Sequence, residues 1–140
     1  VEQYEFPIGR ARMVREGGDV TLIGAALTTG TCLRAADQLA QDGIEAAVVD
    51  LLSISPLDEE TILTAVRATG RAVVVDEGFP RCGLAADVAA LIQSRAFDDL
   101  DGPVKMITAP HAPVPFSRPL EQAFMPDASS VCQAARELTG

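Results

Sequence analysis

Two adjacent carboxylates and a single histidine are the side chains in this sequence that are best suited to acid–base chemistry. Asp76 and Glu77 directly follow an apolar run, and His111 lies in a proline-rich stretch further along. A carboxylate with a raised pKa can act as a general base, and a histidine can complete a catalytic triad. No GxSxG motif accompanies His111, however. We therefore expect all three side chains to serve as helix caps, turn residues or interface contacts at strand ends.

Hydroxyl side chains around Gly30 form a second candidate site. Thr28, Thr29 and Thr31 follow an apolar run that contains Gly24. A strand-to-helix turn of this kind can present backbone N–H groups to a phosphate. Neither GxGxxG nor GxxxxGK[ST] occurs, and an acidic chain is a poor match for phosphate. We interpret the hydroxyls as helix caps, and a free-standing nucleotide-binding regulatory module remains an alternative function.

The three cysteines, Cys32, Cys82 and Cys132, are too far apart to form a CxxC pair. No group of residues has the spacing of a metal site, so we predict no metal ligand. We expect reduced thiols, as in the bacterial cytoplasm or the mitochondrial matrix. Cys32 and Cys132 fall in helical patterns, whereas Cys82 lies in a loop and is the thiol to test for reactivity.

Composition narrows the class of protein. The 140 residues fit one domain, and 20 acidic against 11 basic side chains give a formal charge of −9. This balance argues against a nucleic-acid partner, and no apolar run approaches the ~20 residues of a membrane span. The chain begins at Val1 rather than at a methionine, and we expect it to be part of a longer subunit.

Strand-like and helical patterns alternate along most of the chain. Near-continuous apolar strands separated by amphipathic helices predict a three-layer α/β domain with four or five mostly parallel strands. We expect an arm at residues 1–10 and a single domain at 11–140. The expected strands cover residues 11–16, 19–26, 44–50, 71–76 and 104–108. The expected helices cover residues 32–42, 55–70, 84–97 and 126–138, with extended or turn backbone in the proline-rich stretch between the last strand and the last helix.

Four segments, in the same order, resemble the C-terminal, transketolase-type domain of the β subunit of thiamine-diphosphate-dependent 2-oxo acid dehydrogenases, in the pyruvate, acetoin and branched-chain branch. Residues 7–21 are similar to the family's PIGKA…REG.DVT opening, and residues 50–62 to its DLR[TS]..PLD..TI segment. Residues 76–83 resemble its EEG[WF]…GG turn, and residues 108–127 its closing pattern, in a PHxPVPFS form closest to acetoin and pyruvate dehydrogenases. Leu52 replaces a usual arginine, and Cys82 and Ala85 replace two glycines of the turn.

The resemblance implies a mixed, mostly parallel five-stranded α/β/α sheet with an antiparallel first strand at its edge. It also implies that thiamine diphosphate and magnesium lie elsewhere in the parent complex, between the α subunit and the N-terminal domain of the β subunit. No catalytic, cofactor-binding or metal-binding residue is then expected in this chain, and the isolated domain should be inactive. The parent would oxidatively decarboxylate a 2-oxo acid, or cleave acetoin, and transfer an acyl group to a lipoyl arm.

The domain would thus serve assembly and docking. Its implied partners are the α subunit and a second β subunit in an α2β2 particle, and the basic subunit-binding domain of the acyltransferase core. The acidic turn with Asp98, Asp99 and Asp101 is our predicted docking site, because complementary charge orients such encounters. The alternatives are a solvated loop at this turn, and the equivalent domain of another transketolase relative such as deoxyxylulose-phosphate synthase or transketolase itself.

Overall fold

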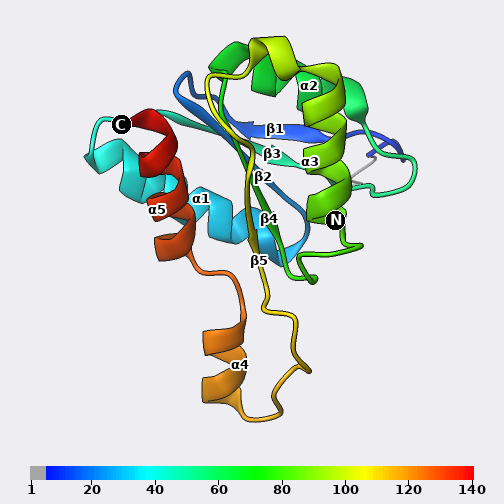
Figure 1. Cartoon of the computed structure of the whole chain (residues 1–140), viewed down its shortest axis with the longest axis vertical. Coiled ribbons are helices and arrows are strands. Elements are labelled where there is room, and N and C mark those ends of the chain that lie inside the picture. Colours follow the sequence, from blue (N-terminus) through cyan, green and yellow to red (C-terminus); the bar gives the residue numbers. More distant parts are fainter. Residues whose placement is uncertain (1–5) are drawn as a thin grey trace, which may run out of the picture.

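The structure, a computed structural model, describes residues 6–140 and shows a five-stranded mixed sheet within that range. The strand order is β1-β3-β2-β4-β5, with β1 antiparallel to β3 and the other neighbours parallel. Helices cover both faces (Figure 1). This confirms the predicted three-layer fold with an antiparallel edge strand. The strands are β1 (Arg12–Arg15), β2 (Val20–Gly24), β3 (Ala46–Asp50), β4 (Ala72–Asp76) and β5 (Lys105–Thr108).

Alternate side chains of each central strand enter two separate hydrophobic clusters. Val73 and Val75 pack with α1 (Leu27–Gln41) and α5 (Ala128–Thr139) on one face. Ala72 and Val74 pack on the other face with α2 (Glu59–Thr69) and α3 (Leu84–Arg95). Both faces of the sheet are therefore buried along its central strands, which explains why those strands are near-continuous apolar runs.

The second helix begins later than the sequence pattern predicts. The helix expected from residue 55 starts at Glu59, because Asp58 is its N-cap and accepts a hydrogen bond from the backbone N–H of Thr61 at 3.2 Å. The same carboxylate accepts from the N–H of Ala11 at 2.9 Å. Asp58 thus joins the start of α2 to the segment that enters β1. Of the predicted arm, residues 1–5 lie outside the described residues.

Residues 96–103 also differ in detail from the expectation. Helix α3 ends at Arg95 rather than near residue 97, and a short 3₁₀ turn, η1 (Phe97–Asp99), follows it. Two of the three acidic side chains of the predicted turn therefore lie on a helical turn. No helix within residues 6–140 is long and apolar enough to cross a bilayer.

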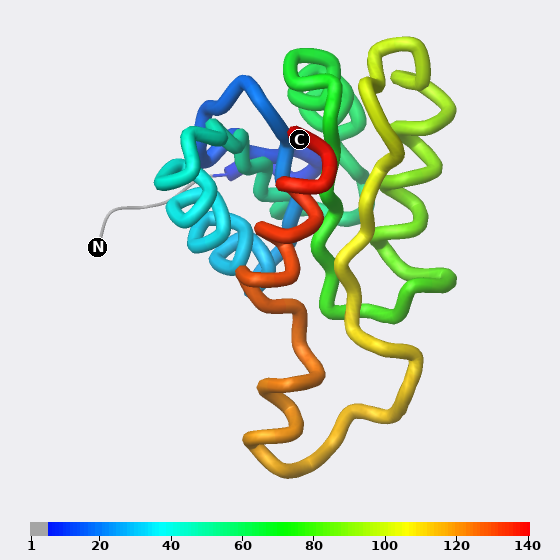
Figure 2. Tube along the Cα trace, turned by 60° about the vertical axis from the view of Figure 1, so that its left-hand side comes forward, coloured from blue at the N-terminus to red at the C-terminus, as the bar shows by residue number. Residues whose placement is uncertain are grey.

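The proline-rich stretch contains a helix that the sequence pattern missed. We call residues 109–126 the strap; it projects from the sheet as a loop that carries α4 (Arg118–Phe124) (Figures 1 and 2). Pro119 is compatible with a helix here because it stands in the first turn, where its missing N–H leaves no bond unmade. The prediction of extended backbone throughout the strap was wrong for these residues.

Candidate binding groove at the carboxyl ends of the strands

The sheet has a crevice where the chain leaves two adjacent strands in opposite directions. Strand β2 leads into α1 on one face, and its neighbour β4 leads into α3 on the other. Ligands of open α/β sheets bind outside the carboxyl ends of the strands at such a switch point. A groove of about 690 Å³ lies at this edge, a size typical of binding sites. Its lining consists of Leu27, Thr28, Thr31, Arg34, Glu77, Val114, Arg118, Glu121, Gln122, Phe124, Met125 and Pro126.

The threonines at the start of α1 hold the loop together from within. The Thr28 hydroxyl donates to the carbonyl oxygen of Val75 at 2.9 Å and accepts from the N–H of Ala25 at 2.9 Å. Thr29 donates to the buried carboxylate of Asp50 at 2.9 Å. The N-cap position of α1 is Ala26 and no side chain caps the helix, so the expectation that these hydroxyls cap α1 was wrong. They instead fasten the β2–α1 turn to β4 and β3.

The neighbouring carboxylates Asp76 and Glu77 lie in different surroundings. Asp76 accepts hydrogen bonds from the backbone N–H groups of Gly78 at 3.0 Å and Ala85 at 3.1 Å, and so holds the loop that leads into α3. Glu77 lines the groove, and its Oε1 is buried without a hydrogen-bond partner among residues 6–140. Asp76 is therefore engaged with its own loop, whereas Glu77 is free to accept a hydrogen bond.

His111 lies beside the loop that contains these carboxylates. Its ring stacks on Phe79 with ring centroids 5.1 Å apart and planes at 29°. The backbone N–H of Ala109 donates to the carbonyl oxygen of Gly78 at 3.1 Å, which ties the start of the strap to the β4–α3 loop. The structure thus gathers Asp76, Glu77 and His111 at the carboxyl edge of the sheet.

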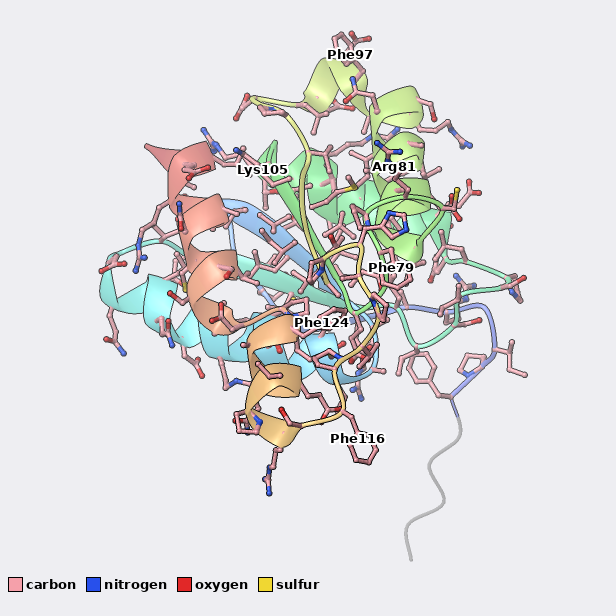
Figure 3. The ribbon with its side chains drawn as sticks, turned by 60° about the horizontal axis from the view of Figure 1, so that its bottom comes forward. Phe79, Arg81, Phe97, Lys105, Phe116 and Phe124 are labelled. Atoms are coloured by element: carbon pink, nitrogen blue, oxygen red, sulfur yellow. The ribbon has the colours of Figure 1, made fainter. Side chains whose placement is uncertain are left out.

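The strap forms the outer wall of the groove and is anchored at its ends. Ala109 is fully buried and Phe124 is 9% exposed, whereas Phe116 is entirely exposed and Leu120 is 60% exposed. Figure 3 shows Phe116 at the outer end of the strap and Phe124 where the strap meets the body. The strap therefore presents apolar side chains that nothing in the described chain covers.

The predicted docking residues lie at the opposite end of the sheet. They precede β5, whereas the strap follows it, and Figure 3 shows Phe97 and Phe116 at opposite ends of the molecule. Asp99 pairs with Arg67 at 3.1 Å and Asp101 with Arg71 at 3.4 Å, while Asp98 forms no ion pair with the described residues. The sequence-predicted residues thus form two separate groups rather than one site.

The cysteines differ in environment as the sequence suggests. Burial raises the pKa of the Cys32 thiol to about 12, and burial also raises the pKa of Cys132. Cys82 is exposed and has a φ of 54°, in the left-handed region that favours glycine. It occupies one of the positions where the resembled turn has glycine. Its reactivity remains a prediction.

Sequence reasoning identified Thr28 and Thr31 as candidates but missed Leu27, Arg34 and the lining that comes from the strap. Arg34 and Arg118 both line the groove although they are far apart in the chain. The spacing of Leu120 and Phe124, four residues apart after Ser117, is a helical signal that could have revealed α4. Among residues 6–140, no group of three or more His, Cys, Asp or Glu side chains is placed to hold a metal ion.

Comparison with known proteins assigns the family. Residues 9–131 match the family described as transketolase, C-terminal domain, and the chain belongs to this family. A solved structure described as a split gene transketolase, inactive beta4 tetramer, superposes with a TM-score of 0.79 at 28% identity, over 99% of this chain and 44% of that one.

Curated relatives specify the branch. The chain is 47% identical over 139 residues to the acetoin:2,6-dichlorophenolindophenol oxidoreductase subunit beta of Bacillus subtilis (strain 168), covering 99% of this chain and 41% of that protein. It is 38% identical over 138 residues to the mitochondrial pyruvate dehydrogenase E1 component subunit beta of Dictyostelium discoideum, covering 99% and 39%. The predicted resemblance is confirmed. The chain spans about two fifths of the length of these relatives.

Proposed function

We propose that this chain is the assembly and docking domain of the β subunit of a thiamine-diphosphate-dependent 2-oxo acid or acetoin dehydrogenase. In this role the strap and the groove contact neighbouring subunits of an α2β2 particle. The parent enzyme decarboxylates or cleaves its substrate at a centre formed by other parts of the assembly. The family membership and the β-subunit relatives support the assignment.

The exposed apolar surface of the strap is the observation that carries the proposal. Val114, Phe116 and Leu120 are at least 60% exposed within one short segment, and Leu27 beside the groove is 72% exposed. Adjoining exposed apolar side chains in a soluble domain mark interaction surfaces. Five prolines restrict the backbone of the strap (Pro110, Pro113, Pro115, Pro119 and Pro126), so it loses less conformational entropy on binding a partner than a loop without prolines would.

Thiamine diphosphate and magnesium belong to another part of the assembly in this proposal. Of the two adjacent carboxylates at the end of β4, Asp76 is engaged with two backbone N–H groups of its own loop, which leaves Glu77 as the only one without a partner among residues 6–140. The hydroxyls of Thr28 and Thr29 are likewise engaged inside the protein. These observations support a domain that contributes contacts rather than a catalytic centre, and the domain alone should be inactive.

A pair of phenylalanine variants tests the assembly role. In the full-length β subunit that carries this domain, Phe116→Asp should disrupt the particle, because it places a charge on an apolar contact. Phe97→Asp changes the same type of side chain, 64% exposed, at the opposite end and should leave the particle intact. Sedimentation velocity of each variant with its α subunit measures the outcome. An intact particle with Phe116→Asp would contradict the proposal.

The acidic turn is the proposed contact for the basic subunit-binding domain of the acyltransferase. Asp99 and Asp101 are already paired with arginines of this chain, so Asp98 should contribute most of the charge to an encounter. Calorimetric titration with that basic domain should show salt-sensitive binding that weakens when all three aspartates become Asn. Unchanged binding would refute this assignment and leave the assembly role standing.

A further inference from the structure

Glu77 is a charged side chain of the groove whose hydrogen-bonding capacity is unused. Its Oε1 is buried and accepts no hydrogen bond, and among residues 6–140 the side chain has no ion-pair partner. A carboxylate oxygen withdrawn from water without a donor carries a desolvation penalty. A donor supplied from outside the chain would recover this free energy.

The groove around Glu77 favours a cationic and partly apolar occupant. Leu27, Val114, Phe124 and Met125 supply apolar walls beside the carboxylate. Arg34, Arg118 and a second glutamate, Glu121, line the same groove, and among residues 6–140 neither arginine forms an ion pair with Glu77. An anionic occupant could pair with the two arginines but would leave Glu77 Oε1 without a donor, whereas a basic side chain supplies one.

The surface outside the groove indicates that the occupant is a protein segment. Phe116 and Leu120 are exposed on the strap yet do not line the groove. A small molecule could fill about 690 Å³ but would leave these side chains in water. A polypeptide that enters the groove and continues across the strap would cover both surfaces, and aromatic side chains such as Phe116 are typical of interface cores.

We infer that the groove receives an apolar segment of a neighbouring subunit and that a basic side chain of this segment pairs with Glu77. The inference rests on the proposed assembly function and adds the chemistry of the contact. Carboxylate–cation hydrogen bonds inside an apolar surround are stronger than exposed ones, so this pair contributes to both affinity and register.

The first test removes the charge of Glu77 and keeps its size. In the assembled particle built from the full-length subunit, Glu77→Gln should raise the dissociation constant at least about tenfold, because the amide cannot neutralise the cation. Glu60→Gln is the matched control on α2, outside the groove, and should leave the constant unchanged. Sedimentation velocity over a dilution series gives both values. Unchanged affinity for Glu77→Gln would overturn the inference.

The second test identifies the occupant. A photo-crosslinking benzoylphenylalanine in place of Val114, which lines the groove and is 62% exposed, should attach to a neighbouring subunit near an arginine or lysine. Each single charge reversal, Glu77→Lys in this chain or replacement of the basic residue by Glu in the neighbouring subunit, should lower the affinity. The two reversals together should restore it. Adducts only within the same chain, or no rescue, would overturn the inference.

The phenylalanine variants separate this inference from the assembly role. If Phe116→Asp disrupts the particle while Glu77→Gln does not, the strap is an interface and the proposed ion pair is wrong. If neither variant weakens the particle, both proposals are wrong. Glu77→Asp retains the charge on a shorter side chain and should keep more affinity than Glu77→Gln; the reverse order would also refute the pairing.

Discussion

The central strands and the strap are held in different ways. Leu22 in β2 is fully buried and belongs to one of the two hydrophobic clusters. Leu120 in α4 is 60% exposed, and α4 makes few contacts with any other helix or strand. The same type of side chain thus stabilises the fold in one region and is left uncovered in the other.

This difference indicates that the two regions serve separate purposes. The body gains its stability from burial on both faces of the sheet, and it needs no partner for that. The strap is held against the body by Phe124, by the stacking of His111 on Phe79 and by its chain ends. Its exposed apolar side chains gain burial only when something else covers them. Substitutions in the body should therefore change the free energy of unfolding, whereas substitutions of the exposed side chains of the strap should change assembly with other subunits.

The largest expected difference comes from a matched pair of leucines. Leu22→Ala should lower the free energy of unfolding by about 2–5 kcal/mol, because it leaves a cavity in the body. Leu120→Ala should change it by no more than about 0.5 kcal/mol, because the side chain is largely in water. Urea denaturation of both variants measures the difference. Equal losses would show that the strap is part of the folding core.

The second expected effect concerns the junction between α2 and the segment that enters β1. Asp58→Ala removes an N-cap and a hydrogen bond to Ala11, and should cost about 1–2 kcal/mol at pH 7. Burial would raise the pKa of Asp58, but hydrogen bonds from Ala11 and Thr61, with the nearby charge of Arg10, outweigh it and lower the pKa.

The lowered pKa of Asp58 determines how the free energy of unfolding changes with pH. The folded protein binds this proton less tightly than the unfolded chain, so the carboxylate stabilises the fold above its ordinary pKa of 3.8. That contribution is lost as the pH falls through the lower folded value. Urea denaturation of the wild type and Asp58→Ala at pH 7 and at pH 2.5, roughly the low end of this window, should show a smaller gap at the lower pH. A constant gap would contradict the assignment.

A smaller effect is expected at the acidic turn, opposite the strap. Asp99→Asn breaks the ion pair with Arg67, in which both side chains are nearly half exposed, and should cost about 0–1 kcal/mol. Asp98→Asn is the control because Asp98 forms no ion pair with the described residues. Thermal unfolding at low and high salt compares them. A larger loss for Asp98→Asn would mean that its role is structural rather than docking.

The body could be predicted from the sequence, and the strap could not. Runs such as Ala72–Asp76 are apolar at every position before their final carboxylate, and this pattern is typical of strands buried on both faces. The prolines of the strap masked α4, since they favour extended backbone at most positions but are compatible with a first helical turn. Position at the strand ends identified Asp76 and Glu77, but only the packing of the strap and α1 around Glu77 distinguishes the two.

The smallest free energy is expected for opening the strap itself. Backbone N–H groups of α4 lie in a short helix with one buried side chain, whereas those of β2 lie between two paired strands. Local opening of α4 should therefore require close to 0 kcal/mol, roughly the value for mobile loops, while β2 should exchange only on global unfolding. Hydrogen exchange followed by mass spectrometry measures both segments, first in the 140-residue chain and then in the assembled particle. Slow exchange of α4 in the chain alone would show that the body holds the strap. Protection that appears only in the particle would assign its apolar surface to a neighbouring subunit.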